Sequence, residues 1–285
     1  MDKRLELDLR ELAARIRVET VKEVAELGFG HIGGSLSVAD ALAVLYGDIM
    51  RIDPARPDWP DRDLLVMSKG HAGPAVYATL ALKGYFPLDW LKTLNKPGTR
   101  LPSHCDRQQT PGVDMTTGSL GQGTSTATGM ALGKKLAGSD VKVYLFVGDG
   151  ELNEGQVWEA AMFSAHNKLD NLVWFVDYNG KQLDGYVKDV LDLGDIAAKF
   201  AAFGFHTESV DGASVSEIHA AIRRCHEVKG KPSCIVLNTI KGKGVSQLEA
   251  IELNHHVQFP ADFAERALVE VEAELAKVRE ERAHV

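Results

Sequence analysis

The spacing of hydrophobic residues predicts a long amphipathic helix at the start of the chain. Apolar residues recur at helical intervals at Leu9, Leu12, Ile16, Val24 and Leu27. Side chains three or four positions apart share one face of a helix, and glycine commonly ends one. Because Gly28 and Gly30 follow this pattern, the helix is predicted to end there.

Further along the chain, short apolar runs alternate with helical patterns. The runs occupy residues 64–68, 141–147, 171–176, 205–210 and 233–240. Positions 143–147 and 172–176 are apolar throughout, which is expected for strands covered by helices on both faces. This order predicts an α/β fold, a doubly wound and mostly parallel sheet flanked by helices, in a single domain spanning residues 1–285.

Three smaller elements complete the predicted fold. Ser37 stands where it could cap a second helix that continues through Val38, Leu42 and Leu45. Residues 51–62 contain three prolines and predict a surface loop. The charged segment 261–282 predicts a C-terminal helix.

Composition excludes several classes of function. The formal charge of −8 comes from scattered residues, which disfavours a nucleic-acid surface and a polybasic membrane anchor. Three cysteines without close pairing predict neither a disulfide scaffold nor a four-cysteine zinc site. The charged N-terminal segment lacks the apolar core of a signal peptide, so a cytoplasmic protein is expected.

The strongest chemical motif is GDGELNEG at residues 148–155, which follows the run at 141–147. In doubly wound sheets, ligands bind at the carboxyl ends of the strands. Asp149 would present a carboxylate there between two glycines, and such hard oxygen ligands suit Mg²⁺ or Ca²⁺ bound together with phosphate. Taken alone, the motif is equally consistent with an ordinary strand-to-helix turn capped by Asp149.

A second motif, VDYNGKQLDG at residues 176–185, follows the next run. Asn179 lies thirty positions after Asp149, a separation that accommodates one βαβ unit. Such a unit would bring both strand ends to the same edge, where the Asp carboxylate and the Asn oxygen could meet one ion. Asn-Gly by itself indicates only a turn, so the pairing is far more specific than either motif.

The third motif is TTGSLGQG at residues 116–123, a glycine-rich entry to a helical pattern. Backbone N–H groups in such a loop can face phosphate oxygens, and the helix dipole adds positive potential. The segment lacks the strand, glycine spacing and downstream acid of a dinucleotide-binding fingerprint, so a nicotinamide-binding domain is the less favoured alternative.

GDGELNEG followed by VDYNGKQLDG resembles the thiamine diphosphate motif, and the wider chain is similar to the N-terminal half of transketolase. The similarity extends from GHIGGSLS at 30–37 through SKGHAGPAVYATLALKGYF at 68–86 and PGVDMTTGSLGQG at 111–123 to KGKG at 241–244. Two departures from the family pattern are Ile32 and Ser119, which stand where many transketolases have proline.

The resemblance implies a set of site residues. Asp149, the Asn179 side chain and the Lys181 carbonyl would bind Mg²⁺ or Ca²⁺, with the cofactor diphosphate supplying the remaining ligands. The residues implied to contact thiamine diphosphate are His71, Gly118, Ser119, Leu120, Gly148, Asp149, Gly150, Glu154, Asn179, Leu183 and His255. Glu154 matches an acid that links two cofactor sites across a subunit interface in the family, although it could equally favour a helix N-terminus as an anion.

Four histidines, His31, His71, His104 and His255, lie in the segments that resemble transketolase and are the predicted catalytic residues. Imidazole suits a reaction that moves protons near neutral pH. The implied reaction transfers a two-carbon unit from a ketose phosphate to an aldose phosphate, with His31 and His71 contacting sugar or cofactor and His104 and His255 stabilising oxygen groups. The adjacent His256 leaves the reacting position open, and His255 is favoured.

The chain ends where the family continues into a pyrimidine-binding domain. The resemblance therefore implies the N-terminal subunit of a split transketolase, active only with a separate C-terminal subunit in an α2β2 assembly. A truncated form, a subunit of a 2-oxo acid dehydrogenase or of deoxyxylulose phosphate synthase, and a non-catalytic assembly subunit are the alternatives. The GHIGG, KGHAGP and KGKG segments favour transketolase.

Overall fold

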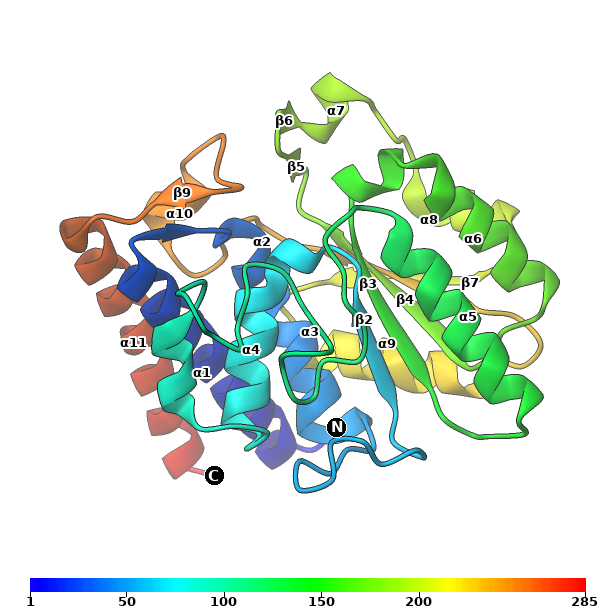
Figure 1. Ribbon diagram of the computed structural model, residues 1–285, viewed down its shortest axis with the longest axis horizontal. Coiled ribbons are helices and arrows are strands. Elements are labelled where there is room, and N and C mark those ends of the chain that lie inside the picture. The colour runs from blue at the N-terminus through cyan, green and yellow to red at the C-terminus, as the bar shows by residue number, and fades with distance from the viewer.

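A five-stranded parallel sheet forms the centre of the computed structural model, which describes residues 1–285 (Figure 1). Its strands are β2 (Leu64–Met67), β3 (Val143–Gly148), β4 (Leu172–Tyr178), β7 (His206–Asp211) and β8 (Ser233–Asn238). They lie in the order β2-β3-β4-β8-β7, and every neighbouring pair is parallel. Each strand overlaps one of the five predicted runs, so the predicted sheet is confirmed.

Helices cover both faces of this sheet (Figure 1). One face carries α1 (Lys3–Leu27), α3 (Ala39–Val44), α4 (Gly73–Leu82), α9 (Val215–Glu227) and α11 (Ala261–Ala283). The other face carries α5 (Gln122–Leu136), α6 (Gly155–His166) and α8 (Ile196–Ala202). The fold is therefore doubly wound, as the alternation of patterns predicted.

Successive residues of each strand divide between two hydrophobic cores. In β4, Val173 and Phe175 pack with the α1 side, whereas Trp174 and Val176 pack with the α6 side. All four side chains are buried, and Phe175 stacks on Phe146 of β3 with ring centroids 4.7 Å apart. A strand that is apolar at every position is thus explained by burial on both faces.

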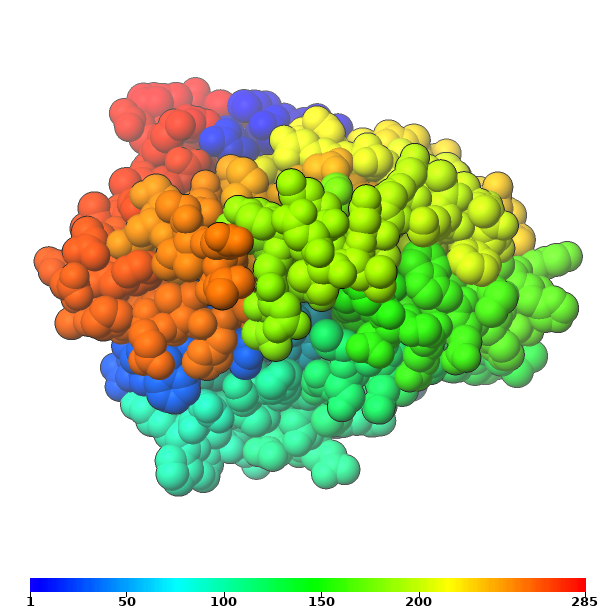
Figure 2. Space-filling view, turned by 90° about the horizontal axis from the view of Figure 1, so that it is seen from above, coloured from blue at the N-terminus to red at the C-terminus, as the bar shows by residue number.

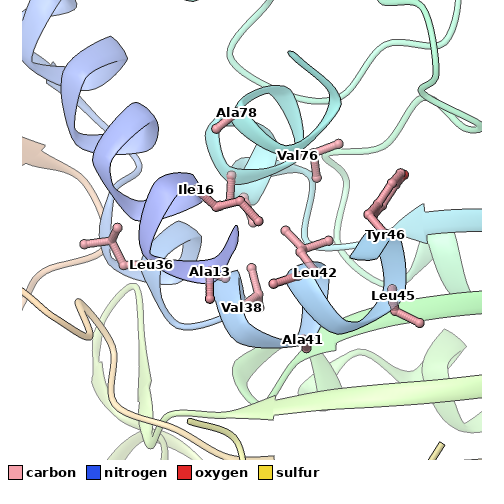
Figure 3. Close-up of a cluster of buried hydrophobic side chains, with 14 of the residues drawn as sticks. Ala13, Ile16, Leu36, Val38, Ala41, Leu42, Leu45, Tyr46, Val76 and Ala78 are labelled. Carbon is pink, nitrogen blue, oxygen red and sulfur yellow. The ribbon is translucent and has the colours of Figure 1, made fainter. Parts of the chain in front are cut away.

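The core on the α1 side is built largely from helices. Figure 3 shows Ile16 of α1, Leu42 of α3 and Val76 of α4 among its buried side chains. Helix α1 ends where the sequence predicts, because Gly28 adopts a φ of 85° and donates its N–H to the Val24 carbonyl. Helix α11 packs along α1, and the prediction of a helix at 261–282 is confirmed.

Short elements frame the carboxyl edge of the sheet. They are β1 (Phe29–Gly30), α2 (Gly33–Leu36), β5 (Lys181–Gln182), β6 (Gly185–Tyr186), α7 (Val187–Val190), α10 (Ser246–Glu249) and β9 (Val257–Gln258). Strand β1 pairs with β9 and β5 pairs with β6, both antiparallel. A 3-10 turn, Gly150–Asn153, separates β3 from α6. Two further 3-10 turns, Gly70–Ala72 and Leu88–Thr93, and a π turn, Leu45–Ile49, flank α4 and α3.

The prediction for Ser37 is wrong. Helix α3 begins at Ala39, and no side chain caps it. The Ser37 hydroxyl instead donates to the Asp177 carboxylate at 2.7 Å. A buried charged acceptor forms a stronger bond than a backbone N–H that a helix end can satisfy in other ways, so the tertiary partner takes precedence.

The surface loop predicted at residues 51–62 is confirmed. Residues 51–62 contain neither helix nor strand. All three cysteines are free and buried. None of the helices has both the length and the apolar character needed to cross a bilayer.

Candidate functional site

A pocket of about 120 Å³ lies at the carboxyl ends of β2, β3, β4 and β8. Its walls come from the residues that follow these four strands, together with α2, Leu120 of the loop before α5, and the segment before β9. Figure 2 looks down on this edge, where the orange segment before α11 and the yellow-green segment after β4 lie side by side. The site therefore occupies the edge at which doubly wound sheets bind ligands.

Asp149 follows the last residue of β3 and is buried at this edge. Its carboxylate accepts hydrogen bonds from the N–H groups of Gly150 at 2.8 Å and Gly180 at 2.6 Å. Burial and the neighbouring Asp177 carboxylate raise the pKa of Asp149 to about 7. Removal from water and a like charge both disfavour the ionised form, so a cation beside Asp149 would be strongly favoured.

Asn179 lies at the end of the neighbouring strand, as the predicted βαβ unit requires. Its Nδ2 donates to Asp177 Oδ2 at 2.8 Å, and its Oδ1 accepts from the Lys181 N–H at 3.1 Å. An ionised carboxylate can only accept and a backbone N–H can only donate. The chemistry of its neighbours therefore fixes the amide orientation.

Asp177 joins four segments of the site. Its buried carboxylate accepts from Lys69 Nζ at 2.6 Å, from the Ser37 and Thr239 hydroxyls, and from Asn179. These donors belong to the segments after β2, α2, β8 and β4. The ammonium and the hydrogen bonds hold the pKa of Asp177 below its usual value although burial opposes this. The Asp177 carboxylate and its four donors form a charged hub, which fixes the positions of the loops around the pocket.

Two lysines carry positive charge into the pocket. Lys69 and Lys241 are both buried, and both line its walls. Lys241 Nζ donates to the Lys181 carbonyl at 3.0 Å, and burial together with the Lys69 ammonium lowers the pKa of Lys241 to about 8. Two buried cations at one pocket provide the local device that an acidic chain needs to hold an anion.

Glycines in the loops around the pocket let the backbone lie close to it. A side chain at Gly150 would place its Cβ 2.5 Å from the Cβ of Gln182, so only glycine fits without a shift. Buried Glu151 accepts from the N–H groups of Gly121 at 2.8 Å and Gly148 at 3.1 Å, and from the Ser68 hydroxyl. Glu151 therefore ties the TTGSLGQG loop to the end of β3.

The oxygen donors of the pocket fit a hard divalent cation. They are the Asp149 carboxylate, the Asn179 side-chain oxygen and the Lys181 carbonyl, all on residues that line one pocket. No group of three or more His, Cys, Asp or Glu residues is arranged to hold a metal ion. A cation bound by one carboxylate and two neutral oxygens needs further oxygens, and a phosphate ligand beside the two lysines would supply them.

The four predicted histidines form one cluster beside the pocket. The ring centroid of His31 lies 5.7 Å from that of His71 and 5.3 Å from those of His104 and His255, and His71 and His255 are 4.4 Å apart. His71 and His255 line the pocket wall. The His256 ring also lies against this cluster, 4.8 Å from the His31 ring and 5.6 Å from the Phe29 ring, but it does not line the pocket wall. The structure thus brings together segments that lie far apart in the sequence.

The histidine rings resist protonation. Burial lowers the pKa of His31 to about 4, with contributions from His256 and His104, and it also lowers the pKa of His104. Burial and the Lys241 ammonium lower the pKa of His255 to about 3, and burial and His255 lower that of His71. Neutral rings can each donate one hydrogen bond and accept another, which suits contacts with sugar hydroxyls.

Most of the predicted residues line the pocket. Those in its walls are His71, Leu120, Gly148, Asp149, Gly150, Asn179, Lys181, Leu183 and His255. Leu120 and Leu183 are exposed, so the pocket has an apolar open side. Gly118, Ser119 and Glu154 lie outside these walls. Gly118 packs near the His104 ring, and the exposed Glu154 lies near Gly121.

Lys69, Lys241, Glu151 and Asp177 were not among the residues predicted from the sequence. Asp177 and Glu151 belong to the two motifs that predict metal binding, but their burial and partners are visible only in three dimensions. Lys69 and Lys241 each follow a predicted strand. Their positions at the ligand edge were the signal that could have identified them.

Comparison with known proteins shows the family. The family described as "Transketolase, thiamine diphosphate binding domain" matches residues 9–267. The chain is 51% identical over 269 residues to the 6-deoxy-6-sulfo-D-fructose transketolase subunit SqwG of Clostridium sp., which covers 94% of this chain and 98% of that protein. It is 37% identical to an apulose-4-phosphate transketolase subunit of Actinobacillus succinogenes, over 94% of this chain and 97% of that protein.

A solved transketolase structure is also similar to this chain. The transketolase of Campylobacter jejuni superposes with a TM-score of 0.87 at 30% identity, covering 98% of this chain and 46% of that one. The chain therefore spans nearly the full length of the transketolase subunits but less than half of that transketolase. The protein belongs to the transketolase family and comprises its thiamine diphosphate-binding domain.

Replacing Asp177 tests the charged hub. Asp177→Asn would leave the Lys69 ammonium buried without a carboxylate, so we expect a loss of about 3–5 kcal/mol in the free energy of unfolding. The matched control is Asp211→Asn, at the end of β7 on the surface, which should change stability by less than about 0.5 kcal/mol. Denaturant unfolding measures both, and equal losses would disprove the role of Asp177.

Replacing His255 tests the neutral histidine cluster. The folded ring stays neutral at pH 5, whereas an unfolded histidine with a pKa near 6.5 takes up a proton. The stabilisation from His255 is therefore present above pH 6.5 and is lost as the pH falls below it. Between pH 7 and pH 5 the unfolding free energy of the natural protein should fall by about 1 kcal/mol more than that of His255→Gln, since the ring is partly exposed.

Denaturant unfolding of both proteins at the two pH values gives this difference. Contributions from titrating groups that do not interact with His255 cancel in the comparison, and the difference reports His255 together with its coupling to His71. An identical fall in the two proteins would show that the His255 ring is protonated as easily in the folded state as in the unfolded chain.

Proposed function

We propose that this chain binds the diphosphate of thiamine diphosphate together with Mg²⁺ (or Ca²⁺), and acts as the N-terminal subunit of a two-subunit transketolase. The observation that carries the proposal is one pocket in which the oxygens of Asp149, Asn179 and Lys181 lie with the buried ammonium groups of Lys69 and Lys241. Oxygen donors suit the cation, and ammonium groups suit the diphosphate.

Different protein groups would bind the divalent cation and the negatively charged diphosphate. Asp149, Asn179 and the Lys181 carbonyl would hold the divalent cation, while Lys69 and Lys241 would offset the charge of the diphosphate. Because Lys241 Nζ donates to the Lys181 carbonyl in this structure, that ammonium would turn toward the diphosphate when the carbonyl binds the cation. Gly150 would let the backbone approach the diphosphate closely.

When bound, thiamine diphosphate supplies the electron sink for cleavage of the carbon–carbon bond next to a ketose carbonyl. The chain's own contribution is orientation and proton handling. His31, His71, His104 and His255 form a neutral cluster at the pocket, so each can donate to a sugar oxygen without adding positive charge beside the two lysines. Leu120 and Leu183 would contact the cofactor rings.

A separate C-terminal subunit would complete the site. Leu120 and Leu183 leave an apolar side of the pocket exposed, and Glu154 is exposed near Gly121 of the glycine loop. Two relatives that this chain matches over nearly their full length are themselves called subunits. A heterotetramer with two copies of each subunit would place Glu154 at the interface between cofactor sites.

The donor would be a ketose with an anionic terminal group. One relative is named for apulose-4-phosphate, and a more similar one is named for 6-deoxy-6-sulfo-D-fructose. A ketose phosphate is therefore the general candidate. The 51% identity to the second relative favours a sulfonated ketose as a specific alternative.

Cofactor binding tests the metal ligands. In the presence of Mg²⁺ and the purified partner, Asp149→Ala and Asn179→Ala should each weaken thiamine diphosphate binding by at least about tenfold, because each removes an oxygen ligand from the cation. Calorimetric titration measures the affinity, and Asp211→Ala at the end of β7 is the matched control. Unchanged affinity in both pocket variants would overturn the assignment of the site.

The same preparations test the need for a partner. The mixed subunits should transfer a two-carbon unit in an assay against ketose phosphates and a sulfonated ketose, whereas this chain alone should not. A complex that assembles but binds no thiamine diphosphate would instead identify a non-catalytic assembly subunit.

A further inference from the structure

A second charged pocket lies beside the amino end of β2, away from the strand ends that form the cofactor pocket. It measures about 240 Å³ and is formed by residues 57–62 and by segments within residues 100–113. It shares no lining residue with the cofactor pocket. Only one of its eleven lining residues is hydrophobic. Such a polar cavity would suit a ligand recognised by charge and hydrogen bonds.

Three arginines, Arg62, Arg100 and Arg107, line this cavity. Arg62 forms an ion pair with buried Asp114 at 2.5 Å, whereas neither Arg100 nor Arg107 forms any ion pair in the structure. Asp58 is the only carboxylate in the cavity wall. Three guanidinium groups around one hollow are notable in a chain whose net charge is −8.

Two of the three guanidinium groups, those of Arg62 and Arg100, are held in place before any ligand arrives, whereas for the exposed Arg107 only the backbone is held. The Arg100 guanidinium lies over the Trp90 ring, 5.4 Å from its centroid. Arg62 donates to the Pro57 carbonyl as well as pairing with Asp114. The backbone N–H of Arg107 donates to the Thr116 hydroxyl at 3.1 Å. Groups already ordered lose less entropy on binding, so the arrangement favours affinity.

We propose that this arginine pocket is a binding site for a small tetrahedral oxyanion, such as inorganic phosphate or the phosphate or sulfonate end of a sugar. Guanidinium groups present paired N–H donors that match the oxygens of such anions. The volume lies below the range of about 300–1,000 Å³ typical of larger organic ligands. A small anion therefore fits both the charge and the size of the cavity.

The pocket is linked to the histidine cluster through its own loop. Arg107 lies three positions after His104, and the Thr117 N–H donates to the Cys105 carbonyl at 3.0 Å. The next residue, Gly118, packs near the His104 ring. An anion held by Arg107 would thus bind the same hydrogen-bonded loop that positions His104.

Trp90 provides a local reporter for the test. The chain has four tryptophans, so a ¹H–¹⁵N spectrum of the full chain contains four indole signals, and Trp90→Phe identifies the one from Trp90. Phosphate should shift the Trp90 signal and saturate with a Kd near or below about 1 mM at constant ionic strength. Phosphate in the cofactor pocket would not shift this signal in the same way, because Arg100, which lies over the Trp90 ring, lines the arginine pocket and not the cofactor pocket.

Variants separate the pocket from general charge effects. Arg107→Ala should abolish saturation, and Arg107→Lys should weaken it because lysine lacks the paired donors. The exposed Arg266 on α11 provides the control, since Arg266→Ala should titrate like the natural protein. A linear shift without saturation, or the same Kd in Arg107→Ala, would overturn the proposal.

The source of the anion is distinguished in the same experiment. Equal affinity for phosphate and a ketose phosphate indicates a site for the free anion, and tighter binding of the ketose phosphate indicates a site for the charged end of a sugar. If neither saturates but the partner subunit shifts the Trp90 signal, the pocket is a protein interface and the proposal fails. None of these outcomes depends on thiamine diphosphate binding, so they are independent of the proposed function.

Discussion

The site depends on one buried carboxylate. Asp177 accepts hydrogen bonds from Lys69, Ser37, Thr239 and Asn179, which come from four segments that are distant in the sequence. A buried charge is costly unless it is fully paired, so these four donors must be in place when the sheet is complete. The demand for pairing holds the loops together and, by orienting the Asn179 amide, points its oxygen away from the hub.

Because Asp177 holds these loops together, groups of opposite charge line the same pocket, and neither charge is favoured where it lies. Asp149 lies beside Asp177 and has a raised pKa, while Lys241 donates to a backbone carbonyl and has a lowered one. Both groups are held in environments that disfavour their charge. A divalent cation with a diphosphate would relieve both, since the cation favours the carboxylate and the phosphates favour the ammonium.

Much of the fold could be predicted from the sequence because its signals are local. Apolar runs identified all five strands of the central sheet, and Gly28 identified the end of α1. The separation of Asp149 and Asn179 identified the βαβ unit that brings them together, because parallel neighbours necessarily align their carboxyl ends. Family resemblance added the histidines, which no spacing rule would connect.

The parts that could not be predicted depend on contacts across the chain. Ser37 has the local character of a helix cap, but its hydroxyl bonds Asp177, which is 140 positions away. Lys69 and Lys241 each follow a predicted strand, which places them at the ligand edge, but their burial depends on contacts with distant segments. The arginine pocket likewise joins residues from separate loops, with no motif to announce it.

The most direct test of this account is a crystal structure of the complex with its partner, thiamine diphosphate and Mn²⁺, in which anomalous scattering locates the cation. The account predicts a cation within about 2.0–2.6 Å of the Asp149 carboxylate, the Asn179 side-chain oxygen and the Lys181 carbonyl. The bond from Asn179 Nδ2 to Asp177 should be retained. A cation elsewhere, or an Asn179 amide turned with its oxygen toward Asp177, would contradict the account.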